Sequence, residues 1–325
     1  MAWFPAPFIV ALASCLSLAA SSALAQATPE YPARSIKVVV PFPAGGATDT
    51  MTRNISQKLG EVLRQPMIVE NRPGAGGTLG ADAVAKSAAD GYTLLAATIA
   101  HAANVSLIPN SPYQLQRDLK AVAIMGLIPL VPVVRTESSI HSLGDLVAAS
   151  RSRNLNAGSS GNGTAAHLGL ELFKSATGSA IQHVPYKGGA PAMVDLIGGQ
   201  VDVIFALLPE ALPHIRSGKL RALAVTSDQR YPLLPDVPTT AEAGAPGVVV
   251  TSWNGLMVPA ATSPEVIAKL NAEIVKIVAA PEMKSRIIEL GFQPVDWSAA
   301  QSDRFIAADV ARWAKVVREA SIKAD

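Results

Sequence analysis

The sequence predicts an α/β protein built from two lobes, with a mainly parallel sheet in each lobe. Three observations lead to this fold class. Short apolar runs typical of buried strands alternate with helical stripes along most of the chain, which favours parallel sheets covered by helices. Two longer apolar stretches, 127–135 and 248–258, indicate crossings between two such units. A chain of 325 residues, 49% of them hydrophobic, can bury two cores.

The N-terminal 25 residues differ from the rest. Residues 8–24 are apolar or small and uncharged, and Ala23-Leu24-Ala25 fits a signal peptidase site. We therefore expect 1–25 to be a secretory signal peptide and the mature chain to be periplasmic, although no Lys or Arg precedes the apolar run. Dilution by Ser and Ala disfavours a membrane anchor. Lipid anchoring at Cys15 stays an alternative, because residues 12–15 resemble a lipoprotein box.

Composition excludes two classes of function. Lys and Arg total 27 against 25 for Asp and Glu, and no basic block stands out, so we expect no nucleic-acid partner. Cys15 is the only cysteine and lies within the predicted signal peptide. A mature chain beginning at Gln26 would therefore have neither disulfides nor thiol catalysis.

The first lobe opens with strand 38–40, which breaks at two prolines and leads through Gly45-Gly46 into a helix that starts at Thr48 or Asp49. The first amides of a helix have no partner within it and carry partial positive charge, so this turn suits an anion. Alternatively, Thr48 or Asp49 only caps the helix. The apolar face of this helix is Met51, Ile55, Leu59 and Val62.

Strands and helices then alternate along the chain. Strand 67–69, loop 71–77, helix 78–88 and strand 92–98 follow, and the prolines of 127–135 make that stretch a poor central strand. The second lobe contains helices 143–150, 164–174 and 191–197, a strand and loop at 156–163, and strands near 181–186, 201–206 and 220–226. Three C-terminal helices begin at Ser263, near Met283 and at a capping box, Ser298 to Gln301. We expect lobe 1 to comprise 26–130 and 250–325, and lobe 2 to comprise 131–249.

A second loop of small residues, Asn156 to Thr164, enters a helix in the second lobe. Two helix N-termini facing each other can hold one anion without a positive side chain. Gly161, Gly163 and Ala166 also fit a loose dinucleotide fingerprint, but no acidic residue for the ribose follows at the right distance. We therefore expect no cofactor.

Three further features are ambiguous from sequence. His167 and Glu171 are four residues apart on one helix, which favours a local hydrogen bond over a metal site because no third ligand is evident. Lys187 follows a strand and either reaches a cleft or faces solvent. Ala206-Leu207 ends a strand, where the side chains either face a ligand or belong to the core.

These motifs together resemble the Bug-type extracytoplasmic solute receptors of tripartite tricarboxylate transporter systems. The resemblance is carried, in order, by Pro41-Phe42-Pro43-Ala44-Gly45-Gly46, Glu70-Asn71-Arg72-Pro73, Gly158 to Glu171, Val184 to Gly188, Gly198 to Asp202, Leu234 to Thr239 and Trp313 to Val317. Each motif alone is weak, whereas their ordered succession covers almost the whole mature chain.

The resemblance implies a type II-like periplasmic-binding-protein fold, a Venus flytrap that closes on a small organic carboxylate and presents it to a two-component membrane permease. It implies no reaction; a two-lobed hydrolase or a sensor domain binding the same anions is the alternative. We also expect a monomer and no metal. The residues that the resemblance and the loop pattern assign to the ligand are Pro43, Gly45, Gly46, Ala47, Thr48, Asp49, Ser159, Ser160, Gly163, Thr164, Ala206 and Leu207, with His167, Glu171 and Lys187 in support.

Two expectations concern charge inside this site. A carboxylate beside a bound anion repels it, so we expect Asp49 to hold a bridging water and to cap its helix instead of touching the ligand. The run Phe205-Ala206-Leu207-Leu208-Pro209 replaces an acidic position of many relatives. An apolar far end would favour an aliphatic or aromatic monocarboxylate over citrate or an acidic amino acid, because an unpaired carboxylate there loses hydration.

Overall fold

The computed structural model describes residues 31–323, and the expectations for the signal peptide and for Cys15 lie outside these residues. The strands are β1 (Ile36–Val40), β2 (Met67–Asn71), β3 (Thr93–Thr98), β4 (Leu119–Arg135), β5 (Leu155–Ser159), β6 (Ile181–Pro185), β7 (Val203–Leu207), β8 (Leu220–Ala222), β9 (Thr251–Pro259) and β10 (Gln293–Pro294). The helices are α2 (Ala47–Leu63), the short 3-10 helix η2 (Ala75–Gly77), α3 (Thr78–Ala85), α4 (Ile99–Leu107), α5 (Leu115–Asp118), α6 (Leu143–Ser152), α7 (Ala165–Thr177), α8 (Gly189–Ile197), α9 (Leu208–Arg216), α10 (Pro264–Ala279), α11 (Pro281–Glu289) and α12 (Ala299–Glu319).

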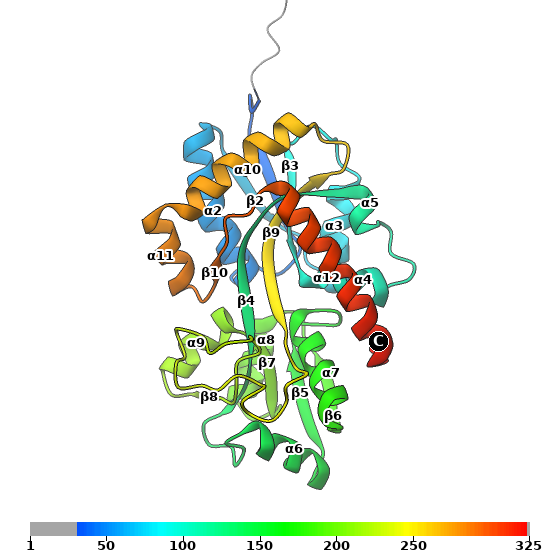
Figure 1. The fold of residues 1–325 in the computed structure, drawn as a ribbon, viewed down its shortest axis with the longest axis vertical. Helices are drawn as coiled ribbons and strands as arrows, with labels where there is room; N and C mark the ends of the chain where they lie inside the picture. The colour runs from blue at the N-terminus through cyan, green and yellow to red at the C-terminus, as the bar shows by residue number, and fades with distance from the viewer. Residues whose placement is uncertain (1–30, 324–325) are drawn as a thin grey trace, which may run out of the picture. The chain divides into compact units, whose positions relative to one another are not determined.

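The strands form one mixed sheet in the order β2-β1-β3-β9-β4-β7-β5-β6, with β8 and β10 also pairing β4. Its two ends are parallel, as expected: β1 lies between β2 and β3, and β5 between β6 and β7. The long strands β4 and β9 are antiparallel and join the two ends (Figure 1). The α/β fold class is confirmed, and its linking strands make the sheet mixed.

The expectation that 127–135 makes a poor central strand is wrong. Strand β4 runs without interruption from Leu119 to Arg135 and lies in the middle of the sheet. Its prolines stand where it changes partners: Pro129 is the last residue paired with β9, and β7 pairing begins at Leu130. The carbonyl of Pro132 accepts the Leu223 amide. A proline costs little at positions where the ladder asks for no N–H donor.

Helix α2 packs on the sheet as its periodicity predicts, with one exception. Met51, Ile55 and Leu59 are fully buried, whereas Val62 is 50% exposed. The helix ends one residue later, at Leu63, and Arg64 adopts a left-handed conformation, so the last turn has left the sheet surface. The apolar stripe therefore covers the first three of the four predicted positions.

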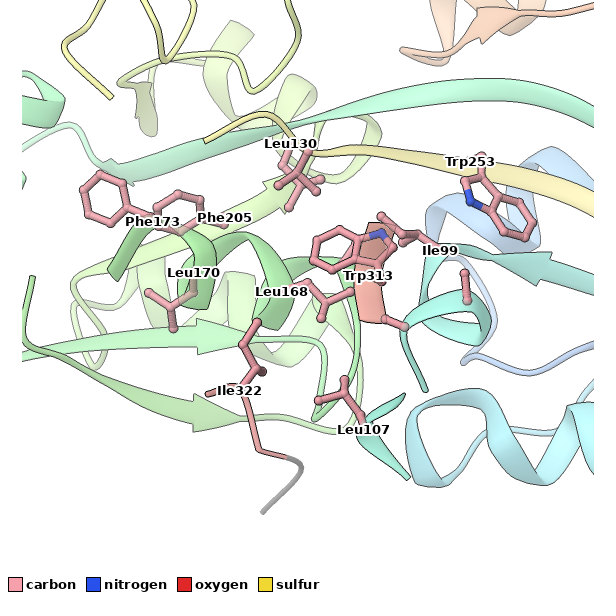
Figure 2. Close-up of a cluster of buried hydrophobic side chains, with 14 of the residues drawn as sticks. Ile99, Leu107, Leu130, Leu168, Leu170, Phe173, Phe205, Trp253, Trp313 and Ile322 are labelled. Carbon is pink, nitrogen blue, oxygen red and sulfur yellow. The ribbon is translucent and has the colours of Figure 1, made fainter. Parts of the chain in front are cut away.

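The C-terminal helices begin at the predicted caps. Ser263 accepts the Val266 amide at the start of α10, and Ser298 and Gln301 form the capping box of α12. Trp313 of α12 is fully buried. Figure 2 shows its ring between Ile99 of α4 and Leu168 of α7. The hydrophobic core is therefore continuous from one end of the sheet to the other.

Residues Arg34–Asp325 form one compact unit, so the proposed lobe boundaries near residues 130 and 250 remain a prediction. Among residues 31–323, no helix combines the length and the apolar character that crossing a bilayer requires.

Candidate functional site

A small cavity of about 70 Å³ lies where the loops after β1, β3, β5, β6 and β7 meet. All of these loops leave the carboxyl ends of parallel strands, the usual place for a ligand in an open α/β sheet. The wall includes residues from both ends of the sheet. They are Phe42, Pro43, Gly46, Ala47, Thr48, Thr98, Ala100, Ser160, Thr164, Ala165, Gly188, Gly189, Leu207, Glu210 and Ser252.

Five helices begin at the wall of this cavity: α2 at Ala47, α4 at Ile99 after Thr98, α7 at Ala165, α8 at Gly189 and α9 at Leu208 after Leu207. Their first amides are free of intrahelical partners and lie at the positive ends of the helix dipoles. The hydroxyl-bearing residues Thr48, Thr98, Ser160, Thr164 and Ser252 also line the wall. No Lys or Arg belongs to the described lining. The cavity therefore suits an anion held by amides and hydroxyls.

The first loop is held by the Asp49 carboxylate. It accepts hydrogen bonds from the Gly45 amide, from Arg53 Nε and from Asn71 Nδ2, each at 2.9 Å. Asn71 also donates to the Phe42 carbonyl at 3.0 Å, which ties the loop to the end of β2. The expected helix-capping role of Asp49 is wrong: Gly46 is the N-cap, without a side-chain cap, and Asp49 fixes the loop before the helix.

These contacts keep Asp49 ionised. Burial by itself would raise the pKa of Asp49, but hydrogen bonds from Arg53, Gly45 and Asn71 outweigh it and hold the pKa below its ordinary value. Asp49 is 3% exposed and is absent from the described cavity lining. Its hydrogen bonds are thus directed to the first loop, to Arg53 and to Asn71.

The second loop is fixed by hydroxyl and imidazole contacts. Ser159 Oγ lies 2.6 Å from His183 Nε2 and accepts the Gly161 amide at 3.1 Å. Thr164 Oγ1 donates to the Gly161 carbonyl at 2.7 Å. His167 Nδ1 accepts the Gly163 amide at 3.1 Å, and its ring stacks on His183 with centroids 4.2 Å apart. These histidines shape the backbone that presents Ser160 and Thr164 to the cavity.

The start of α4 is held in a similar way. Thr98 Oγ1 accepts the Ala100 amide at 3.3 Å, and His101 Nδ1 accepts the Thr98 amide at 3.0 Å. Burial lowers the pKa of His101 to about 4. The ring is therefore neutral at physiological pH, which leaves Nδ1 able to accept the amide.

Loops from the two ends of the sheet lie in close contact beside the cavity. A Cβ added to Gly163 would lie 2.3 Å from Asn104 Oδ1, and one added to Gly76 would lie 2.6 Å from the Asn162 carbonyl oxygen. Gly188 packs on Pro43 in the same manner. Glycine at these positions allows the loops to approach closely.

The predicted site residues divide into two groups. The structure brings Pro43, Gly46, Ala47, Thr48, Ser160, Thr164 and Leu207 to the cavity wall. The others support this wall from outside it: Gly45, Asp49, Ser159 and Gly163 belong to the two loops, and Gly45 lines an adjoining cavity. The assignment of Ala206 to the site is wrong, because Ala206 is 1% exposed and belongs to the core. Leu207 is the residue of the pair that lines the cavity.

The supporting residues also find their places. Glu171 Oε1 accepts from Lys174 Nζ at 2.8 Å, while His167 Nδ1 is taken by the Gly163 amide, so the structure gives these atoms separate partners. Lys187 is exposed and lines an adjoining cavity between the glycine loop of η2 and the second loop. Among the described residues, no three His, Cys, Asp or Glu side chains gather as a metal site.

Sequence reasoning missed Glu210, the acidic residue in the cavity wall. The expected far end, 205–209, is apolar, but α9 continues from it and places Glu210 in the cavity wall. Burial raises the pKa of Glu210 to about 7, while a hydrogen bond from the Ala47 amide lowers it. An acidic residue one turn into a helix is common at an N-terminus, so no sequence signal marked it as unusual.

Comparison with known proteins agrees with this geometry. The sequence model described as "Tripartite tricarboxylate transporter family receptor" matches residues 51–322. Protein BugT of Bordetella pertussis is 44% identical over 297 residues, which cover 90% of this chain and 91% of BugT. The solved Rpa4515 of R. palustris with adipate is 35% identical, with a TM-score of 0.87, covering 90% of this chain and 99% of that one.

A second solved structure, MatC from Rhodopseudomonas palustris with bound malate, is 33% identical, with a TM-score of 0.84, and the match covers 88% of this chain and all of MatC. The solved periplasmic binding protein BugD is 32% identical with a TM-score of 0.85, covering 90% of this chain and 99% of BugD. The fold is thus that of periplasmic binding proteins, and the chain belongs to the tripartite tricarboxylate transporter receptor family.

Proposed function

We propose that the protein captures a small organic carboxylate in this cavity and delivers it, in the periplasm, to a two-component membrane permease. The observation that carries the proposal is the meeting of several helix N-termini and five hydroxyl-bearing residues at one cavity whose lining, among the described residues, has no Lys or Arg. Such a site binds an anion through hydrogen bonds and helix dipoles. Adipate and malate are the ligands named for two solved relatives, which supports a carboxylate.

The proposal includes a lobe movement. Lobe 1, 26–130 with 250–325, and lobe 2, 131–249, contribute different walls, so the cleft must open for a ligand to enter. The contacts of Gly163 with Asn104 and of Gly76 with Asn162 then form when it closes. In this scheme the first-loop and second-loop residues hold the carboxylate from opposite sides, and the receptor acts as a monomer without a cofactor.

The test is a thermal-shift screen of organic acids, followed by calorimetry and recovery of the acid. A bound acid raises the melting temperature in a saturable way, because it binds only the folded state. Thr164→Val should weaken binding, since Thr164 lines the cavity and its hydroxyl holds the second loop through the Gly161 carbonyl. Thr177→Val is the matched control, because that hydroxyl bonds Phe173 and Ser179 at the far end of α7.

Three outcomes would contradict the proposal. If no carboxylate stabilises the protein, the site is not a carboxylate receptor. Turnover of the recovered acid would favour the hydrolase alternative. Saturable binding without receptor-dependent uptake in cells that contain the permease would favour the sensor alternative.

A further inference from the structure

Glu210 lies in the cavity wall between two helix N-termini. It is the third residue of α9, and its carboxylate accepts a hydrogen bond from the amide of Ala47, the first residue of α2. A Cβ added to Gly189, the first residue of α8, would lie 2.5 Å from Oε2. One added to Gly46 would lie 3.8 Å from Oε1. The absence of a side chain at Gly189 therefore makes the space that the carboxylate fills.

Among the described residues, no Lys or Arg side chain lines this cavity to pair with the Glu210 carboxylate. The described lining contains no Lys or Arg, and the groups acting on its pKa are burial, which raises it to about 7, and the Ala47 amide, which lowers it. Charged groups on neighbouring elements lie outside this cavity, although Glu210 also lines the adjoining cavity that contains Arg216 and Glu289. Asp49 of α2 is occupied by Gly45, Arg53 and Asn71, while exposed Arg216 of α9 and Glu289 of α11 line the cavity on the other side of Glu210.

The site therefore has two electrostatic parts. The positive N-terminal ends of α4 and α7 attract a negative group, whereas Glu210, which lies against the first residues of α2 and α8, attracts a positive one. A dicarboxylate would place a second negative charge in a cavity that already contains a carboxylate and no cation. A zwitterion satisfies both parts. Its ammonium group pairs with the Glu210 carboxylate and so offsets the cost of keeping that carboxylate ionised in a buried position.

We propose that Glu210 selects the ligand class: the receptor binds a short monocarboxylate that also carries an ammonium group, with the carboxylate on the helix N-termini and the ammonium on Glu210. This inference rests on the proposed function and narrows it. The small cavity volume, about 70 Å³, and the apolar Phe42, Pro43 and Leu207 in its wall fit a short, compact ligand body.

The experiment compares acids that differ in one group. Calorimetry would measure the affinity of the wild-type protein for 2-, 3- and 4-aminobutyrate, 2-hydroxybutyrate, butyrate and succinate. The same comparison of amino, hydroxy, plain and dicarboxylic acids would be made with three-carbon and five-carbon chains. We expect at least one amino acid of this series to bind at least about tenfold tighter than the plain and dicarboxylic acids of equal length. Glu210→Gln, which keeps the size and shape of the side chain, should weaken binding of that amino acid by at least about tenfold and strengthen binding of succinate.

Glu289→Gln is the matched control, because Glu289 is also acidic but lines only the adjoining cavity, and it should leave every affinity unchanged. The pH profile gives a second readout. Affinity for the amino acid should rise as pH rises through about 7, where Glu210 ionises, whereas affinity for succinate should fall. Melting curves of the ligand-free Glu210→Gln variant show whether it is folded.

The outcomes separate this inference from the proposed function. If butyrate, hydroxybutyrate or succinate binds wild type more tightly than every amino acid tested, carboxylate capture stands and the role of Glu210 is refuted. If Glu210→Gln strengthens the binding of all acids equally, Glu210 only repels ligand carboxylates. That result would also refute its role in selecting an ammonium group. If no acid binds, including adipate and malate, the proposed function fails together with this inference.

Discussion

In the proposed lobe movement, closure of the cleft requires the absence of a side chain at Gly163, and replacing this residue by alanine tests that requirement. Gly163 has a φ of +71°, and an added Cβ would lie 2.3 Å from Asn104 Oδ1. The asparagine cannot simply turn away, because its Nδ2 donates to the Gly76 carbonyl at 3.1 Å. Gly163→Ala should therefore strain the loop in every state and, in addition, obstruct the closed state.

The two effects have different sizes and consequences. A left-handed backbone costs a non-glycine residue about 1–2 kcal/mol, which lowers stability whether the cleft is open or closed. Displacing the packed Asn104 side chain costs about 1–3 kcal/mol more, the usual range for overpacking. If only the closed form suffers this second cost, ligand affinity falls by about 5-fold to 150-fold.

Gly178→Ala is the matched control, because Gly178 has a φ of +66° and no atom within 4 Å of the added Cβ. Urea unfolding should show similar losses of stability for the two alanine variants. Calorimetry with the best-binding acid of the screen should show an affinity loss for Gly163→Ala only. Small-angle X-ray scattering should show that this variant stays more extended when the acid is added.

A double-mutant cycle completes the test. Adding Asn104→Ala to Gly163→Ala removes the obstructing atom, so the double variant should bind more tightly than the sum of the single changes predicts. Equal affinities for Gly163→Ala and Gly178→Ala, or a cycle without coupling, would refute the closing contact.

Three other predictions follow from buried polar groups. Asp49→Asn should lower unfolding stability by about 1–3 kcal/mol and weaken ligand binding, because an amide cannot accept all three hydrogen bonds, including that from Gly45; unchanged melting temperature and affinity would contradict this role. Because the pKa of Glu210 is raised from 4.5 to about 7, wild type should lose stability as pH rises through that window, by at most about 3 kcal/mol. Urea unfolding at several pH values should show that Glu210→Gln lacks this loss of stability. Parallel stability profiles of wild type and variant against pH would contradict the prediction. Thr226→Val should cost about 2 kcal/mol, because Oγ1 accepts the Leu130 amide at 2.8 Å and donates to the Val250 carbonyl at 2.6 Å; a loss below about 0.5 kcal/mol in urea unfolding would contradict it.

The local features of the fold could be predicted from the sequence, whereas some long-range features could not. Helix caps at Ser263 and Ser298 and the parallel strand sets were predictable, because a cap or a βαβ unit depends on neighbouring residues. The continuous path of β4 was not, since a proline is harmful only where the ladder needs its N–H, and that depends on the partner strand.

The same division holds for the site. The sequence by itself determined the two small-residue loops, because glycine turns followed by helix starts are local features that create anion-binding amides. Only the tertiary structure decided that Ala206 is core, that Asp49 and Asn71 hold the first loop, and that Glu210 enters the cavity. The physical reason is that burial and charge compensation depend on which distant groups meet, and the spacing of residues along one chain does not specify that.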